Sequence, residues 1–237
     1  MKIYTKEDLK DAHWDIRLEA YRALGYNKQA LKDENWFIRQ EARKALGLYT
    51  EQDLKDAHWD IRLEAYRVLG FTEEAFKDDH WGVRQEAYRT LGFTEEAFKD
   101  VNGRIRLEAY KSLGFNEQAL EDDDWFIRRG AYRSLGFTEQ AFKDAHWRNR
   151  QEAYRTLGFK EEAFKDKDWE VRIKAYQTLG FTEQALKDEY WEIRQEAKIY
   201  LDFMKNTTTE DAPLHLNSEN EIIALAANHM LERSKLK

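Results

Sequence analysis

Nine arginines recur at steps of 22 or 23 residues and are the first candidates for chemistry. A guanidinium group offers several N–H donors in a planar fork, so a row of them could bind phosphate or carboxylate groups. An aspartate lies six residues before each arginine, and a tryptophan lies three residues before eight of them. The arginines are Arg17, Arg39, Arg62, Arg84, Arg106, Arg128, Arg150, Arg172 and Arg194. Because each can pair with an aspartate and lie against aromatic rings, we expect a structural ladder rather than a phosphate-binding row.

These spacings define nine tandem repeats, which must position every other candidate residue. Each repeat opens at the aspartate, which we number position one, so that the tryptophan is at position four and the arginine at position seven. The opening residues are Asp11, Asp33, Asp56, Asp78, Asp100, Asp122, Asp144, Asp166 and Asp188. A repeat of 22 residues buries too little apolar surface to fold alone, so we expect neighbouring repeats to stack.

Each repeat predicts a helix, a stop and a shorter second helix. The opening aspartate is expected to cap the first helix, because its carboxylate can accept a hydrogen bond from a free backbone N–H group. Apolar residues at positions six, ten and fourteen form one stripe at helical spacing, as Ile16, Ala20 and Leu24 do in the first repeat. A glycine at position fifteen, such as Gly92, is expected to end this helix in the left-handed conformation. A threonine such as Thr94 can then cap the second helix.

The motif Leu-Lys-Asp-x-x-Trp-x-Ile-Arg at residues 31–39 resembles the short units of HEAT-like and leucine-rich-repeat-variant proteins, including those of phycobilisome-lyase-like proteins. The opening Asp, the Ile or Val before the Arg and the Ala three residues after it carry the resemblance, which extends from residue 4 to about residue 203. It implies a ladder between the Asp and Arg residues of neighbouring repeats. The predicted fold is therefore all-α: a right-handed α-solenoid of nine 22-residue two-helix repeats with a C-terminal capping helix.

The chain is expected to have three parts. Residues 1–204 form the solenoid, residues 205–217 a polar linker that contains the only proline, and residues 218–237 an amphipathic helix that opens with a capping box. The last repeat of a stack must be covered, so we expect this helix to fold onto the ninth repeat. Docking of the helix to a partner, or to a second copy of the chain, is the alternative.

The departures from the repeat gather in repeats five to seven. Gly103 replaces the tryptophan of position four, Gly130 replaces the glutamate of position nine, and Asn149 replaces the apolar residue of position six. Basic residues accumulate at positions five, eight and twelve of the same repeats, and Gly130 removes a glutamate that would neutralise Arg133. We hypothesise a basic patch about 20 Å across that binds an anionic group beside the notch at position four. The predicted site is Gly103, Arg104, Lys111, Arg129, Arg133, Arg148 and Arg155. Drift within a redundant array is the alternative.

Other candidates are interpreted as structural. Histidine is found at position three of four repeats, but layers about 10 Å apart are too far from one another for His58 and His80 to share a metal. The acidic run at residues 121–124 suits a helix N-terminus rather than calcium. Apolar residues at positions five and eight, such as Phe126 and Leu63, would suit a protein partner if they are exposed. We expect no metal and no cofactor.

Composition narrows the classes of function. The chain has 237 residues, 39 basic and 46 acidic residues, a formal net charge of −7 and no cysteine. This excludes a disulfide framework and thiol catalysis, and it argues against a protein whose whole surface binds nucleic acid or anionic membrane. No apolar run approaches the roughly 20 residues of a membrane span, and the N-terminus has no hydrophobic signal segment. We therefore expect a cytoplasmic protein.

The expected function is a non-enzymatic scaffold that binds a macromolecular partner, first of all a protein, with an anionic ligand or nucleic acid at the central patch. The chain has no Gly-rich phosphate loop, no His-Glu-x-x-His and no Gly-x-Ser-x-Gly motif. One alternative is an enzyme that binds DNA, similar in general architecture to the HEAT-repeat glycosylases that act on alkylated bases. A purely structural spacer is a second alternative, and the oligomeric state is left open.

Overall fold

The computed structural model describes residues 3–235, and within this range no residue lies in a β-strand. The α-helices are α1 (Trp14–Leu24), α2 (Trp36–Leu46), α3 (Trp59–Leu69), α4 (Trp81–Leu91), α5 (Gly103–Leu113), α6 (Trp125–Leu135), α7 (Trp147–Leu157), α8 (Trp169–Leu179), α9 (Trp191–Asn206) and α10 (Glu221–Lys235). The 3-10 helices are η1 (Asp8–Lys10), η2 (Ala30–Lys32), η3 (Glu51–Lys55), η4 (Glu73–Lys77), η5 (Glu95–Lys99), η6 (Glu117–Glu121), η7 (Glu139–Lys143), η8 (Glu161–Lys165), η9 (Glu183–Lys187) and η10 (Ala212–His215). None of the described helices combines the length and apolar character that crossing a membrane requires.

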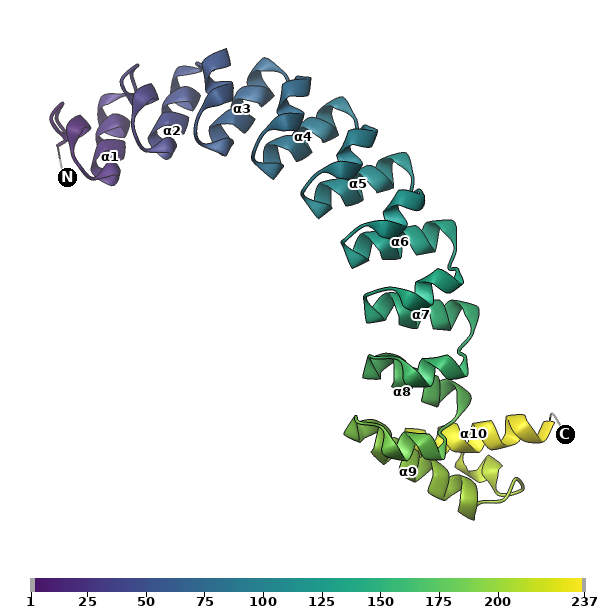
Figure 1. The fold of residues 1–237 in the computed structure, drawn as a ribbon. Coiled ribbons are helices and arrows are strands. Elements are labelled where there is room, and N and C mark those ends of the chain that lie inside the picture. The colour runs from purple at the N-terminus through teal and green to yellow at the C-terminus, as the bar shows by residue number, and fades with distance from the viewer. Residues whose placement is uncertain (1–2, 236–237) are drawn as a thin grey trace. The chain divides into compact units, whose positions relative to one another are not determined.

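The chain divides into two compact units, Met1–Gly114 and Phe115–Lys237, which we call the N-terminal and C-terminal units. Within each unit, an α-helix packs against the 3-10 helix that precedes it, as α3 does on η3 and α8 on η8. Consecutive α-helices also pack together, for example α3 with α4 and α7 with α8 (Figure 1). The all-helical stack of repeated helix pairs predicted from the sequence is therefore confirmed.

The core of each repeat lies between its α-helix and the 3-10 helices. Position ten is fully buried in every repeat and position six in all but the first, where Ile16 is half-buried. The leucine at position fourteen is not buried as predicted, since Leu24 and Leu91 are each 47% exposed. The tyrosine at position eleven takes its place in the core. The ring centroid of Tyr88 lies 4.3 Å from that of Phe76 and 5.6 Å from that of Phe93, and the rings are stacked. The buried stripe therefore consists of positions six, ten and eleven.

The helix caps differ from the prediction by two residues. Each repeat's α-helix begins at position four, so position three is the N-cap. In the fourth repeat, His80 Nδ1 accepts a hydrogen bond from the backbone N–H of Gly82 (3.2 Å). The opening Asp78 accepts one from the backbone N–H of His80 (2.8 Å) and thereby fixes the turn that leads into the helix. The threonine predicted to cap the second helix is at the N-cap of η5, but the side chain of Thr94 makes no capping bond.

The positive φ predicted for the glycine at position fifteen is confirmed, but in Gly92 the predicted left-handed helical conformation is not found. Gly92, with φ 101° and ψ 148°, ends α4 in an extended conformation that suits glycine. Its N–H donates to the carbonyl of Tyr88 (2.9 Å). Gly47, with φ 64° and ψ 27°, has the left-handed helical conformation that was predicted for this position.

The C-terminal helix packs on the last repeat. Helix α10 lies against α9, and Ala226, Ala227 and Met230 join the core that contains Tyr200 (Figure 1). The hydroxyl of Tyr200 is hydrogen-bonded to Nδ1 of His229 (3.0 Å) in the same interface. Residues 207–220, which connect the two helices, include the short helix η10.

Candidate functional site

The arginines of position seven form the predicted ladder within each unit. Arg84 donates from Nε to Asp100 Oδ2 (2.7 Å) and from Nη2 to Asp100 Oδ1 (2.8 Å), and its Nη1 donates to the carbonyl of Asp78 (2.8 Å). The same pairing joins Arg17 to Asp33, Arg39 to Asp56, Arg62 to Asp78, Arg128 to Asp144, Arg150 to Asp166 and Arg172 to Asp188. Each of these guanidinium groups thus connects two successive repeats, and its donors are used in structural hydrogen bonds.

Five aspartates of the ladder have pKa values below the ordinary value: Asp33, Asp56, Asp78, Asp144 and Asp188. Burial raises the pKa of Asp144, but hydrogen bonds from Arg128 and from the backbone N–H of His146 outweigh burial and hold the pKa below its ordinary value. Burial raises the pKa of Asp33 as well, and the bonds from Arg17 and from the backbone of Asn35 lower it overall. The ladder therefore pairs full charges in largely buried surroundings.

The tryptophans and histidines form a second ladder. The ring of Trp36 stacks on that of His58 in the next repeat, with centroids 3.8 Å apart, and Trp125 stacks on His146 at 4.1 Å. Where position three is a tyrosine the stack persists, since Trp169 and Tyr190 are 4.1 Å apart. Within residues 3–235, no group of three or more His, Asp or Glu side chains is arranged to hold a metal ion. His58, His80 and His146 act as helix caps and stacking partners. The side chain of His13 makes no capping bond.

The predicted basic residues belong to two different repeat interfaces. Gly103, Arg104 and Lys111 lie on α5 of the N-terminal unit. Arg129, Arg133, Arg148 and Arg155 lie on α6 and α7 of the C-terminal unit. The structure brings these four arginines together in one pocket. That they form a single patch with Gly103, Arg104 and Lys111 stays a prediction.

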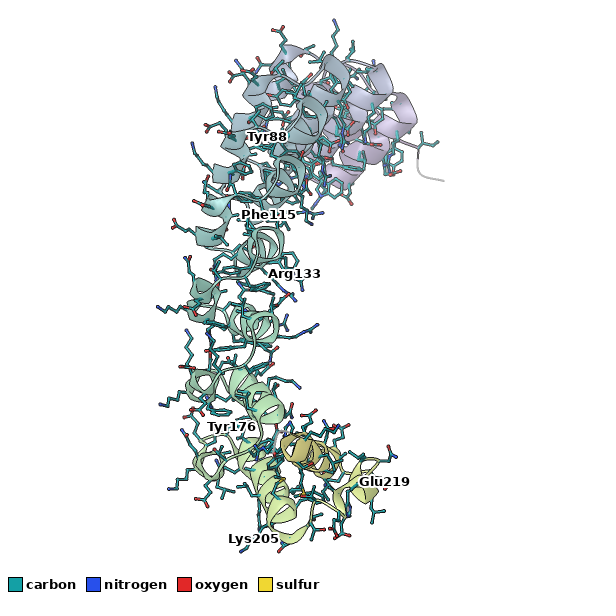
Figure 2. All side chains as sticks on the ribbon, turned by 90° about the vertical axis from the view of Figure 1, so that its right-hand side faces the viewer. Tyr88, Phe115, Arg133, Tyr176, Lys205 and Glu219 are labelled. Atoms are coloured by element: carbon teal, nitrogen blue, oxygen red, sulfur yellow. The ribbon has the colours of Figure 1, made fainter. Side chains whose placement is uncertain are left out.

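The four arginines line one cavity of about 340 Å³, which we call the α6–α7 pocket. Its lining is Arg129, Arg133, Trp147, Arg148, Gln151, Glu152, Arg155 and Thr156. Figure 2 shows Tyr176 of the same unit between the α-helices and the 3-10 helices, whereas Arg133 lies on the opposite side of the α-helices. The pocket is therefore on the α-helical side, away from the stacked aromatic core.

One carboxylate holds two of the arginines. Arg129 Nε donates to Glu152 Oε2 (2.6 Å), and Arg133 Nε donates to Glu152 Oε1 (2.6 Å). Burial raises the pKa of Glu152, but the hydrogen bonds from Arg133 and Arg129 outweigh it and keep the pKa below its ordinary value. Glu152 is thus a carboxylate at neutral pH and fixes both guanidinium groups in place.

The other two arginines have no carboxylate partner among the residues described. The guanidinium carbon of Arg148 lies 5.1 Å from the ring centroid of Trp147 and 5.6 Å from that of Trp125. Such contacts attract the cation without using its N–H donors. The side chain of Arg155 makes no hydrogen bond or ion pair within residues 3–235. Four guanidinium groups and one carboxylate give the pocket an excess of three positive charges.

The reason for the unpaired Arg155 lies in the next repeat. A position-twelve arginine elsewhere donates to the position-nine glutamate of the following repeat, as Arg89 does to Glu108 (2.7 Å). In the eighth repeat position nine is Lys174, whose Nζ donates instead to Gln177 Oε1 (2.8 Å). The substitution removes the acceptor that Arg155 would otherwise have.

One predicted consequence of the repeat departures needs correction, and another is confirmed. Gly130 does not leave Arg133 unneutralised, because Arg133 pairs with Glu152 of the next repeat. A Cβ atom at Gly130 would lie 2.5 Å from Cζ of Phe115, so this glycine makes room for a ring. Asn149 is fully buried, as expected for position six. Its Nδ2 donates to the carbonyl of Trp125 (3.0 Å), while its Oδ1 accepts no hydrogen bond from the described residues.

Most of the apolar side chains of position eight, which were considered as a contact surface for a protein partner, are buried. Leu18, Leu63 and Ile173 are buried, which contradicts the exposure that such a surface requires. Phe126 at position five is exposed. These position-eight side chains are part of the core. Exposed apolar residues recur instead at position fourteen, as Leu91, Leu113, Leu135 and Leu157 show.

The sequence prediction missed several lining residues. Trp147, Gln151, Glu152 and Thr156 line the pocket but were not among the predicted site residues. The sequence feature that could have indicated the pocket is Lys174. It replaces the glutamate of position nine in the eighth repeat, one repeat after Arg148 and Arg155. No protein-family model matches the chain, and a comparison with curated proteins finds no significant match.

Proposed function

We propose that this protein is a non-enzymatic repeat scaffold that binds a partner protein through the α6–α7 pocket. The observation that supports it best is the pocket itself: four arginines around a single carboxylate, on a chain whose net charge is −7. The ladder arginines cannot serve this purpose, because their donors are bonded to aspartates and to backbone carbonyls. A concentrated positive charge in an acidic protein favours a specific anionic group on a partner.

The same proposal places the chain among HEAT-like short helical repeats. The 22-residue period and the ladder between the opening Asp of one repeat and the Arg of the preceding repeat support this assignment. Proteins built in this way offer the same helix face in every repeat, and one deviating interface can become a binding site. The fold alone does not specify a partner, so the chemistry of the pocket must supply it.

The proposal is tested by partner capture from the native cell extract. The immobilised full chain is compared with R148E/R155E and with the matched control K165E/K187E, which makes the same charge change at exposed residues of η8 and η9. We expect one set of proteins to be retained by the wild type and the control but lost with R148E/R155E. All three proteins should have the same circular dichroism. Identical retention by all three would contradict the proposal.

The same variants separate the scaffold from the DNA-binding alternative. Binding to phosphate backbones weakens steeply with salt and does not need a protein partner. Retention of duplex DNA that falls with salt, together with release of an alkylated base, would support the glycosylase-like enzyme instead. We expect no retention of duplex DNA at 150 mM salt, about physiological ionic strength.

A further inference from the structure

We propose that the α6–α7 pocket binds a phosphate monoester on a side chain of the partner, such as phosphoserine. This inference rests on the scaffold function proposed above and specifies the group that the pocket recognises. It follows from the unused hydrogen-bond donors of the pocket, from the fixed positions of its arginines and from the negative charge of the neighbouring repeats.

The first observation is the number of unused donors. Glu152 uses only Nε of Arg129 and of Arg133, so Nη1 and Nη2 of both residues have no partner in the described part of the chain. The side chains of Arg148 and Arg155 donate no hydrogen bond to any residue between 3 and 235. A phosphate monoester offers three strong acceptor oxygens and carries a charge of about −1.5 to −2 at pH 7. A dianion of this kind matches the excess of three positive charges better than a single carboxylate does.

The second observation is that the guanidinium groups are already held. Arg129 and Arg133 are fixed on one carboxylate, and Arg148 lies over the rings of Trp125 and Trp147. Side chains fixed before binding lose less entropy when a ligand arrives. The cavity of about 340 Å³ is near the lower end of the range of ligand pockets, about 300–1,000 Å³. It therefore suits one phosphorylated side chain.

The third observation is that carboxylates replace the arginine of position five in the repeats that follow the pocket. Position five, which is Arg148 in α7, is Glu170 in α8 and Glu192 in α9. A nucleic acid running along the repeats of the C-terminal unit would meet these carboxylates, because its charge is continuous. A single phosphate on an otherwise uncharged or basic protein segment would not. The charge pattern favours a phosphoprotein over a nucleic acid.

The experiment titrates the full chain with N-acetyl-phosphoserine amide and follows the arginine Nε–H signals by NMR. The matched probes are the serine and glutamate analogues, inorganic phosphate and a short single-stranded oligonucleotide. We expect the phosphoserine probe to bind at least tenfold more tightly than the serine and glutamate analogues, and inorganic phosphate to compete. R148E/R155E should lose at least tenfold in affinity, and K165E/K187E should be unchanged. The single exposed variant R155Q, which removes no bond to the described chain, should lose several-fold and covers the case in which the double variant does not fold.

The outcomes separate this inference from the scaffold function. Equal binding of the phosphoserine and glutamate probes, or tighter binding of the oligonucleotide, would overturn the phosphate assignment. Partner capture that depends on Arg148 and Arg155 but survives phosphatase treatment of the extract would keep the scaffold and remove the phosphate. Affinity for the phosphoserine probe should also fall below about pH 6, where the phosphate takes up a proton. A pH-independent affinity would count against the dianion.

Discussion

The interface between α4 and α5 in the N-terminal unit and the α6–α7 pocket in the C-terminal unit use the same repeat positions. In the first, Gln85 and Arg89 both donate to Glu108, at 2.8 Å and 2.7 Å. In the second, Arg129 and Arg133 both donate to Glu152, at 2.6 Å each. The glutamate of position nine is thus an acceptor for the preceding repeat in both places. The same backbone arrangement carries different side chains: four arginines line the α6–α7 pocket, whereas the α4–α5 interface has Arg89, Arg104 and Lys111.

The two regions also differ at position four and in the partner of the position-five arginine. Position four is Gly103 in α5 but Trp147 in α7, so only the second region has an indole from its own helix under the position-five arginine. Arg104 instead lies 3.8 Å from Glu108, as a weak ion pair on one helix. Glu108 therefore serves as the acceptor for Arg89 and Arg104 at the α4–α5 interface. Each region has one such glutamate, so the larger positive excess of the α6–α7 pocket comes from its four arginines and from Lys174, which replaces the glutamate that would accept from Arg155.

The largest expected effect concerns what the two regions share, which is the ladder. R84A in the N-terminal unit and R150A in the C-terminal unit should each reduce the free energy of unfolding by about 3–5 kcal/mol, because each leaves a buried aspartate unpaired. R148A and R155A should change it by less than about 0.5 kcal/mol, as exposed substitutions usually do. Urea unfolding measures all four. Similar losses for ladder and pocket variants would remove the division between structural and binding arginines.

The second prediction concerns the helical glycines of the two units. G130A should destabilise the C-terminal unit by about 1–3 kcal/mol, because the added Cβ would overlap the ring of Phe115. G82A in the N-terminal unit should be within about 0.5 kcal/mol of the wild type, since the atoms nearest to its Cβ, Cε1 and Nδ1 of His80, are 3.2 Å away and need only a small shift. Thermal unfolding compares the two variants. A G130A protein as stable as the wild type would mean that this glycine is drift rather than a packing requirement.

The third prediction transfers the pocket. Q85R/G103W/K111R gives the α4–α5 interface the same residues as the α6–α7 pocket at positions eight, four and twelve. Introduced into the R148E/R155E background, it should restore binding of the phosphoserine probe by about tenfold, or roughly 1.4 kcal/mol. The NMR titration described above measures it. R104E is then added to the protein that carries the transferred pocket. If that protein still binds the phosphoserine probe, the arginine of position five is not needed for binding.

Sequence reasoning predicted the repeat and the ladder because both depend on periodicity. Arg84 and Asp100 are 16 residues apart, and the other ladder pairs have the same separation except Arg39 and Asp56, which are 17 apart. Stacking brings the two residues of each pair together even if the helix ends are predicted inexactly. The caps were misplaced because both position one and position three carry residues that can accept a backbone N–H. The spacing could not decide between Asp78 and His80.

The pocket was predicted only in part, for a physical reason. Helical spacing identified the exposed face that carries Arg129, Arg133 and Arg148. It assigned the position-nine glutamate to an arginine of the same helix, although Glu152 accepts from the preceding helix instead. Pairing between repeats depends on how far one helix is shifted along the next, and a single sequence does not determine that shift. For the same reason the role of Lys174 went unrecognised.

The smallest expected effect is a pH dependence that separates the histidine ladder from the arginine ladder. Burial lowers the pKa of His58 and of His146 below their ordinary value of 6.5, and both rings accept a backbone N–H through Nδ1. The carboxylates Asp60 and Asp56 near His58 raise its pKa, whereas Arg39 and Arg62 lower it. Asp144 raises the pKa of His146, whereas Arg148, Arg128 and Arg150 lower it.

Because the folded state holds these histidines neutral, the unfolded chain binds protons more strongly near pH 6. Their contribution to stability is therefore complete above about pH 6.5 and declines as the pH falls toward the lowered pKa values of the folded state. Asparagine at position three also caps an α-helix, as Asn35 does, so H58N/H146N keeps the cap while removing the titration and the stacked ring. The wild type should lose more stability between pH 7 and pH 5.5 than this variant does, as measured by urea midpoints at each pH. Parallel pH profiles would assign the loss to the carboxylates of the arginine ladder, which both proteins share.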